Sequence, residues 1–214
     1  IGGIGFLVWE DLKKCKWKFR YYRLHTKMVI FATGVLIIGG TLLMFLFEWG
    51  QPSMEGKTLG QQILSAFFQA VTPRTAGFNT VDLNALTDSS QMLMVCLMFI
   101  GGSPGSTAGG IKTTTILVLM LTIWTELRKR KDLELFRRRV EGEAIRHACC
   151  LMMFYGLLSI GSSMAIATIE NLGIKQTLFE TVSALCTVGL SLGITSSLGM
   201  VSQVILILLM FIGR

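Results

Sequence analysis

The chain contains 214 residues, of which 51% are hydrophobic, and it carries a formal net charge of +7. A soluble domain of this size could not bury so much apolar surface in one core, so we expect a membrane protein. The basic residues gather at 13–27 and 128–146, beside apolar runs of membrane length. This placement argues against nucleic-acid binding and is typical of cytoplasmic segments under the positive-inside rule.

Both ends of the sequence lie in apolar runs, at Ile1 and Arg214, and no signal-peptide pattern opens the chain. We therefore expect an internal piece of a longer protein, or a truncated one. None of the five cysteines forms a CxxC pair. We expect unpaired thiols in cytoplasmic or buried positions.

The first apolar span covers residues 28–47 and holds no charged side chain. Twenty helical residues span about 30 Å of hydrocarbon, so this segment predicts a transmembrane helix. A polar stretch follows at 48–57. The next apolar segment, 59–71, is too short to cross and predicts a re-entrant half-helix that leads into an irregular loop at 72–80.

A second long apolar run, 92–124, is interrupted at 101–110 by five glycines and one proline. Helix breakers at this density predict a broken helix, and in a membrane such a break normally lines a cavity. A gate and a structural kink without a gating role both remain open. A phosphate-binding loop is disfavoured, because Ile111 separates Gly110 from Lys112.

The same order of segments then recurs, with an uncharged span at 148–169, a short apolar segment at 177–186 and an apolar run from 200 onward. The offset that separates Thr75 from Thr187 also aligns Gly77 with Gly189 and residues 98–101 with 210–213. A parallel repeat of this kind is common in membrane transport folds. Two crossings separate the basic segments, so both are predicted to be cytoplasmic, with the half-helices entering from outside.

Each short helix is followed by a Thr-x-Gly loop. Glycine allows positive φ, which lets neighbouring carbonyls point the same way, and a ring of carbonyls can replace the hydration shell of K⁺. A simple turn after a helix C-terminus is the other interpretation of each glycine. Because two such loops occur at equivalent positions of the repeat, we favour a K⁺ selectivity filter over a pair of simple turns.

The sequences TPRTAGFNT at 72–80 and TVGLS at 187–191 resemble the third and fourth pore loops of the Trk/Ktr/HKT potassium transporter superfamily, and above all its bacterial Ktr-type membrane subunit. Residues 101–113 resemble the broken helix of the third repeat. The resemblance implies an all-α polytopic membrane protein with repeated units of helix, pore half-helix, filter loop and helix around a pore. Residues 1–27 then hold the end of a helix and a basic cytoplasmic segment, 28–127 the third repeat, and 128–214 a second basic segment and a truncated fourth repeat.

The resemblance also implies a K⁺ site and a gate. K⁺ is expected at the filter carbonyls of Thr75, Ala76, Gly77, Phe78, Asn79, Cys186, Thr187, Val188, Gly189 and Leu190. The gate is expected at Gly101, Gly102, Ser103, Pro104, Gly105, Ser106, Thr107, Ala108, Gly109, Gly110 and Arg214. The repeat places Arg214 on Gly102, inside a span where charge is costly, although an exposed chain end would also explain it. Snorkelling is the simple interpretation of Lys112.

The implied function is K⁺ uptake across the plasma membrane, with Na⁺ as a second candidate ion. The implied partners are the lipid bilayer, a second copy in a homodimer, and a cytosolic ring of nucleotide-binding regulatory subunits that docks on 9–27 and 124–146. No nucleic acid is expected. The predicted spans lack Asp, Glu and His, which argues against an intramembrane enzyme. A membrane scaffold without transport activity is the alternative function.

Overall fold

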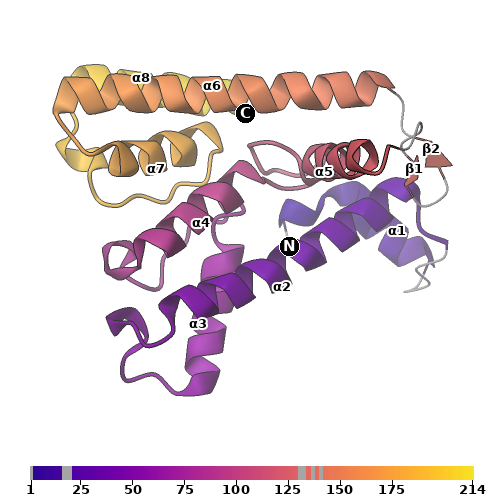
Figure 1. Ribbon diagram of the computed structural model, residues 1–214, viewed down its shortest axis with the longest axis horizontal. Coiled ribbons are helices and arrows are strands. Elements are labelled where there is room, and N and C mark those ends of the chain that lie inside the picture. The colour runs from indigo at the N-terminus through magenta and orange to yellow at the C-terminus, as the bar shows by residue number, and fades with distance from the viewer. Residues whose placement is uncertain (1, 16–20, 130–133, 136–137, 140–141) are drawn as a thin grey trace.

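The computed structural model describes residues 2–15, 21–129, 134–135, 138–139 and 142–214. Apart from a ladder between the two-residue strands β1 (Glu134–Leu135) and β2 (Arg138–Arg139), its regular structure is helical, as predicted. Figure 1 shows two long helices, α2 (Leu24–Glu48) and α6 (Gly142–Glu170), with the shorter helices packed beside them. Side chains of 134–141, within the predicted docking segment, lie outside the described part of the chain.

Helices α2 and α6 are long and apolar enough to cross a membrane. They contain the predicted spans 28–47 and 148–169, but each continues into charged residues, and both end on a glutamate. The predicted spans themselves hold no Asp, Glu or His, whereas the longer helices that contain them also include His25, Glu48, His147 and Glu170. Each terminal glutamate accepts hydrogen bonds from the start of a later helix, as described below.

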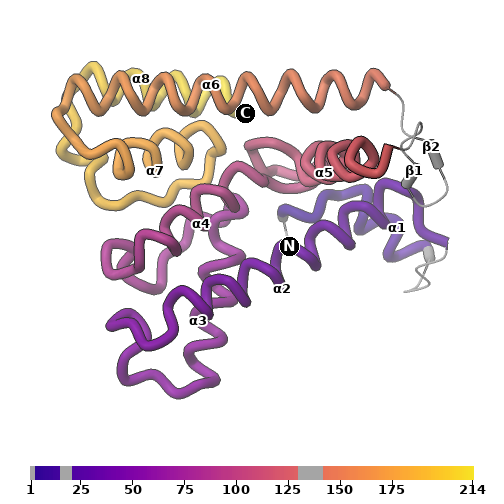
Figure 2. The backbone as a smooth tube through the Cα atoms, viewed as in Figure 1, coloured from indigo at the N-terminus to yellow at the C-terminus, as the bar shows by residue number. Residues whose placement is uncertain are grey.

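The chain builds the same unit twice, and Figure 2 follows both copies along the backbone. In the first, α2 leads through the 3₁₀ turn η3 (Pro52–Met54) to the short helix α3 (Leu59–Val71), and a loop with η4 (Leu83–Ala85) leads to α4 (Asp88–Phe99) and α5 (Thr113–Leu127). In the second, α6 leads to α7 (Ile174–Leu185), and a loop with η5 (Thr195–Ser197) leads to α8 (Met200–Ile212). The bounds of α3 and the start of α8 are those predicted, whereas α7 begins at Ile174, before the predicted residue 177.

The N-terminal segment differs from the expected tail of one apolar helix. A 3₁₀ turn, η1 (Gly2–Ile4), precedes a separate helix α1 (Phe6–Cys15). Gly5 lies between them with φ +89°, a left-handed conformation that ends the first element and turns the chain.

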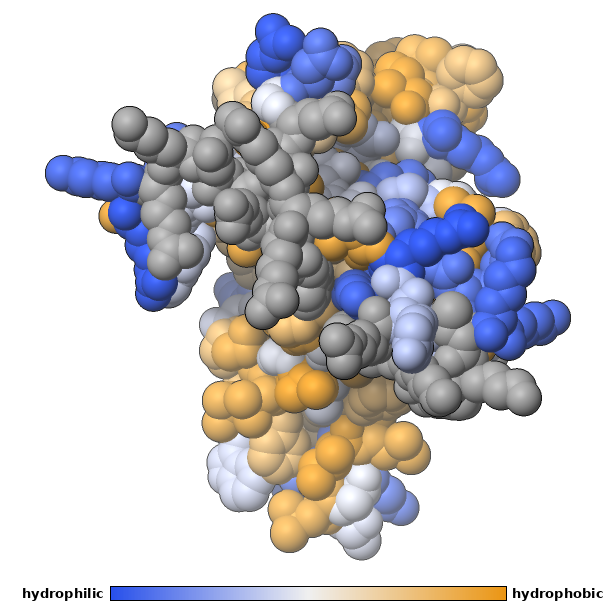
Figure 3. All heavy atoms as spheres, turned by 90° about the vertical axis from the view of Figure 1, so that its right-hand side faces the viewer, coloured by the Kyte–Doolittle hydropathy of each residue, from blue (hydrophilic) through white to orange (hydrophobic). Residues whose placement is uncertain are grey.

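The surface of the short helix α3 is largely apolar. Leu59, Ile63, Leu64 and Phe67 are all exposed. Figure 3, seen from the right-hand side of Figure 1, shows hydrophobic residues predominating in its lower part, where Figure 1 places α3. An apolar surface of this extent belongs in lipid or against another membrane helix.

The two units share one core. Met94 and Met98 of α4 are fully buried against Phe179 and Val182 of α7, together with Val188 from the following loop. This packing joins the end of the first unit to the short helix of the second. It therefore holds the loop after α7 close to the break between α4 and α5.

A carboxylate at the end of the long helix of each unit, buried for Glu48 and partly exposed for Glu170, lies against the start of a later helix. Glu48, at the end of α2, accepts hydrogen bonds from the backbone nitrogen of Thr87 at 3.0 Å and from its hydroxyl at 2.9 Å. Glu170, at the end of α6, accepts from the backbone nitrogen of Gly199 at 2.9 Å and from the Ser202 hydroxyl. Thr87 and Gly199 are the N-caps of α4 and α8. Each carboxylate thus satisfies a helix N-terminus, where negative charge is also favoured.

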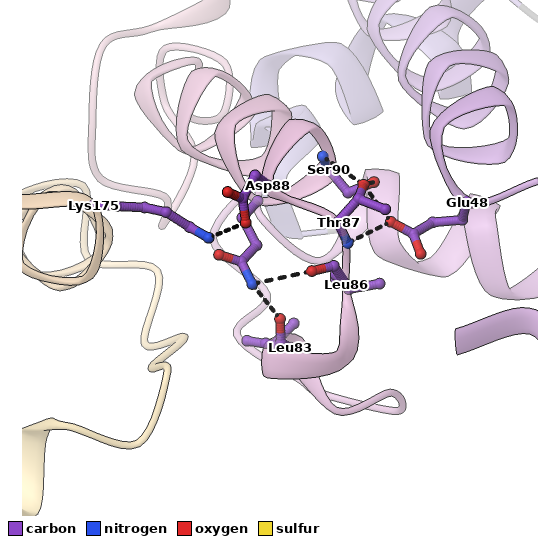
Figure 4. A network of polar contacts seen from close by, with 8 residues as sticks. Glu48, Leu83, Leu86, Thr87, Asp88, Ser90 and Lys175 are labelled. Carbon is purple, nitrogen blue, oxygen red and sulfur yellow. Dashed lines mark hydrogen bonds and ion pairs between the residues drawn. The ribbon is translucent and has the colours of Figure 1, made fainter. Parts of the chain in front are cut away.

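Figure 4 shows the Glu48 contacts beside an ion pair between Asp88 and Lys175. That ion pair connects α4 to α7, but both side chains are largely exposed, so its contribution to stability is small. The Glu48 contacts matter more, because the Glu48 side chain is only 1% exposed.

We expect Glu48→Ala to lower the stability of the protein by about 1–3 kcal/mol, because the buried donors of Thr87 lose their acceptor. The melting temperature of the purified protein in detergent measures this loss. Glu55→Ala is the matched control, since Glu55 is an exposed acid in the same connection between α2 and α3. Equal melting temperatures for the two variants would contradict the role assigned to Glu48.

Candidate functional site

The two loops that follow α3 and α7 share an unusual backbone. Thr75 and Thr187 have φ of 62° and 54°, and Gly77 and Gly189 have φ of 72° and 87°. Left-handed φ is uncommon for a β-branched residue and costs on the order of 1–3 kcal/mol, so it persists only where the surroundings impose it. The same pair of conformations at the same repeat positions marks both loops as built structures rather than simple turns.

Hydrogen bonds to the last turns of the short helices impose this path. The backbone nitrogens of Ala76 and Gly77 both donate to the carbonyl of Thr72, at 3.1 and 3.2 Å. In the second unit, the nitrogen of Val188 donates to the carbonyl of Ser183 at 2.9 Å. These bonds satisfy helix-terminal carbonyls and hold each loop beneath the end of its helix.

The two loops touch each other through their backbones. A Cβ atom built on Gly77 would lie 2.2 Å from the carbonyl oxygen of Val188, far inside contact distance. Farther out, the side-chain amide of Asn84 donates to the carbonyl of Leu192 at 3.2 Å. The structure therefore brings the predicted filter residues 75–77 and 186–190 together. Asn79 differs, because its side chain accepts from the nitrogen of Val81 within its own exposed turn.

The break between α4 and α5 is a closed loop, as the cluster of glycines and proline at 101–110 predicted. Its neck is held by two bonds, from the nitrogen of Gly101 to the carbonyl of Ile111 at 2.9 Å and from the nitrogen of Thr113 to the carbonyl of Gly102 at 3.1 Å. Lys112 donates to the carbonyl of Ala108 at 2.5 Å. The ammonium of Lys112 thus binds the loop itself, which replaces the snorkelling interpretation.

This loop lies directly against the predicted filter loop of the second unit. A Cβ atom on Gly109 would be 2.1 Å from the hydroxyl oxygen of Thr187 and 3.0 Å from the carbonyl oxygen of Cys186. The N-terminal segment holds the other side of the loop, since the nitrogen of Ser103 donates to the carbonyl of Gly3 at 2.8 Å. The predicted gate residues therefore lie between the N-terminal segment and the predicted filter.

Two cavities adjoin the loops. The larger has a volume of about 450 Å³ and lies between Arg214 and the predicted filter residues of the second unit. Its lining includes Glu180, Thr187, Val188, Gly189, Leu190 and Arg214. The smaller, of about 220 Å³, lies between Thr75, Ala76, Gly102 and Thr107 and contains Arg74. The Arg74 guanidinium makes one long hydrogen bond, 3.4 Å to the hydroxyl of Thr33, and its Nε has no partner in the described part of the chain.

Sequence reasoning missed three contributors to this site. Arg74 lies within the quoted motif but was given no role of its own. Glu180 is a buried acid in α7, and it accepts hydrogen bonds from Ser191, Leu192 and Thr195 in the loop outside the filter. The third contributor is a pair of hydroxyls, that of Thr72 at the end of α3 and that of Ser183 near the end of α7. An ionisable residue inside a predicted half-helix was the signal that could have drawn attention to Glu180.

We expect Gly77→Ala to disrupt the contact between the loops, because the new methyl group would meet both the Val188 carbonyl and an unfavourable φ. The yield and the melting temperature of the purified protein should both fall. Gly60→Ala is the control, since Gly60 lies in α3 with nothing within 4 Å of its Cβ position, and alanine favours the helix there. A Gly77→Ala protein as stable as the control would contradict the close approach.

Comparison with known proteins places this geometry in a family. The family model TrkH, described as "Cation transport protein", matches residues 4–214. The chain is 37% identical to "Ktr system potassium uptake protein B" of Vibrio alginolyticus and 34% identical to "Potassium/sodium uptake protein NtpJ" of Enterococcus hirae, over its whole length. It spans about half of these relatives, 47% and 48%.

A solved structure shares the fold. The crystal structure of the potassium transporter TrkH from Vibrio parahaemolyticus superposes on the whole chain with a TM-score of 0.79, at 20% sequence identity, and the match covers 47% of that protein. At this identity the likeness concerns the fold alone. The family match over residues 4–214 identifies the chain as a member of the TrkH family of cation transport proteins.

Proposed function

We propose that this protein takes part in K⁺ uptake across the plasma membrane, through a pore whose narrow part includes residues 75–77 and 187–189. The observation that carries the proposal is the pair of loops at equivalent repeat positions, each with a threonine and a glycine at positive φ, in backbone contact at Gly77 and Val188. Backbone carbonyls held by such loops can replace the hydration shell of an alkali cation.

The choice of K⁺ draws on the relatives, whose names describe potassium uptake and, for the Enterococcus hirae protein, potassium/sodium uptake. Na⁺ is therefore the second candidate ion. Each loop has a single glycine where the most selective K⁺ filters have TVGYG, so we expect weaker discrimination against Na⁺.

The full-length gene product, purified and placed in liposomes, should carry Rb⁺ or K⁺ down a gradient, and K⁺ should compete better than Na⁺. A membrane scaffold, the alternative function, gives no flux above that of empty liposomes. Flux measured with ⁸⁶Rb⁺ at several K⁺ and Na⁺ concentrations decides between them. Absence of flux from correctly folded protein would reject transport as its function.

The loop at 101–110, with Arg214, is the proposed gate. Three observations support it: Gly109 lies against Thr187 of the proposed filter loop, hydrogen bonds at Gly101 and Gly102 hold the two ends of the loop together, and Arg214 lines the cavity beside Thr187. A fixed positive charge near a cation path raises the barrier to passage.

We expect a deletion of residues 104–107 to raise Rb⁺ flux several-fold, because it shortens the obstructing loop and leaves the neck bonds from Gly101 to Ile111 and from Thr113 to Gly102 in place. Uptake is measured in cells that express equal amounts of each protein. A shortened protein that reaches the membrane but transports less would mean that the loop supports the pore and does not gate it.

We further propose a homodimer with a cytosolic ring of nucleotide-binding regulatory subunits on the basic segments. In the described part of these segments, Trp9 and Trp124 are exposed, and Arg128 lies 4.5 Å from the Trp124 ring. Exposed aromatic and basic side chains together suit a protein partner. The same basic residues also attract anionic lipid, by about 1 kcal/mol each.

A further inference from the structure

Each filter loop is tied back to its helix by a buried hydroxyl. The Thr72 hydroxyl, at the end of α3, donates to the carbonyl of Phe78 at 2.5 Å. The Ser183 hydroxyl, near the end of α7, donates to the carbonyl of Leu190 at 2.5 Å. Thr72 and Ser183 are 2% and 3% exposed, so both donor residues are shielded from water.

The two donors come from different positions of the repeat, but their acceptors come from the same position. The repeat offset that joins Gly77 to Gly189 also joins Phe78 to Leu190, whereas it joins Thr72 to Ala184 and Val71 to Ser183. A contact inherited passively with the repeat would keep the donor position too. The feature that recurs is therefore the capture of the first carbonyl after the filter glycine.

This capture limits which oxygens can face an ion. A carbonyl held by a hydroxyl on its own helix is directed back toward that helix. In the described structure, no side chain donates a hydrogen bond to the carbonyls of residues 75–77, nor to those of 187–189. The outer part of the second loop is drawn back further, since the Glu180 carboxylate accepts from the nitrogen of Leu192 at 3.0 Å and from the Thr195 hydroxyl at 2.8 Å.

We propose that Thr72 and Ser183 are positioning residues for ion specificity. They hold the Phe78 and Leu190 carbonyls away from the path, so that an ion leaves the oxygens of Gly77 and Gly189 directly into water. The proposal rests on the transport function above and narrows its filter to residues 75–77 and 187–189 in these two loops. Selectivity depends on the number and freedom of the oxygens around the ion, so releasing the two carbonyls changes it.

The test removes the hydroxyls with little change in volume, by Thr72→Val and Ser183→Ala in the full-length protein, singly and together. We expect the ratio of the Na⁺ KM to the K⁺ KM for competition with ⁸⁶Rb⁺ uptake to fall about five- to tenfold in the double variant, as the loss of one or two such hydrogen bonds implies. The maximal rate should change much less. If the double variant does not reach the membrane, the KM ratio is measured in the two single variants instead.

Matched controls separate positioning from general damage. Ser65→Ala removes a buried hydroxyl of α3 that has no hydrogen-bond partner among the described residues. Thr181→Val removes a hydroxyl of α7 whose bonds in the described part of the chain go to the carbonyls of Leu178 in α7 and Ser159 in α6. Both should keep the parent ratio. The conservative variants Thr72→Ser and Ser183→Thr retain a hydroxyl, so they should keep the parent ratio of the Na⁺ KM to the K⁺ KM.

Two results would overturn the proposal: a ratio within twofold of the parent in both hydroxyl-free variants, or the same loss of ratio in Thr72→Ser as in Thr72→Val. In either case the parent still transports, so the transport function stands. Absence of Rb⁺ flux from the unchanged protein is a different outcome, because it rejects the transport function and this proposal with it.

Discussion

Backbone groups at membrane depth have no water to bond with, and the structure satisfies them locally wherever the chain leaves the helix. The loop after α3 does so with bonds from Ala76 and Gly77 to the carbonyl of Thr72, and the broken helix does so with the bonds across its neck. Every irregular segment of the site is therefore tied to the end of a helix. This constraint places the loops, and the loops in turn place the carbonyls that an ion would meet.

Three buried or half-buried glutamates also satisfy backbone nitrogens where the chain leaves or enters a helix. Glu48 and Glu170 each accept the first free nitrogen of a following helix, and Glu180 accepts from the loop beyond the second filter. A carboxylate that accepts several hydrogen bonds tolerates burial that an isolated one would not. Glu48 and Glu170 thus connect helices, and Glu180 connects α7 to the loop that follows it.

The sequence predicted the parts of the fold that depend on local composition. Helix α3 ends just before Pro73, which has no N–H to continue the helical hydrogen bonds, and the break at 101–110 follows from its glycines and proline. Glu48 and Glu170 were missed because a fixed offset cannot align them: residues 49–58 connect α2 to α3, whereas only 171–173 connect α6 to α7. The hydroxyls of Thr72 and Ser183 were missed for a related reason, since they occupy different repeat positions and only their acceptors coincide. A sequence repeat reveals residues at equivalent positions, but it does not reveal donors at different positions that bond to equivalent carbonyls.

Gly77 and Gly189 show that glycine can be required for two separate reasons, its backbone conformation and the space beside it. Both Gly77 and Gly189 need positive φ, and that demand alone would select glycine at each. Gly77 carries a second constraint, because the Val188 carbonyl occupies the place of a Cβ, whereas nothing described lies within 4 Å of the corresponding point on Gly189. The conformation is thus a property of each unit by itself, and the close approach is a property of the contact between the units. A repeated sequence can specify the first twice, but the second arises only where a loop meets its neighbour, so equal residues in the two repeats need not tolerate equal change.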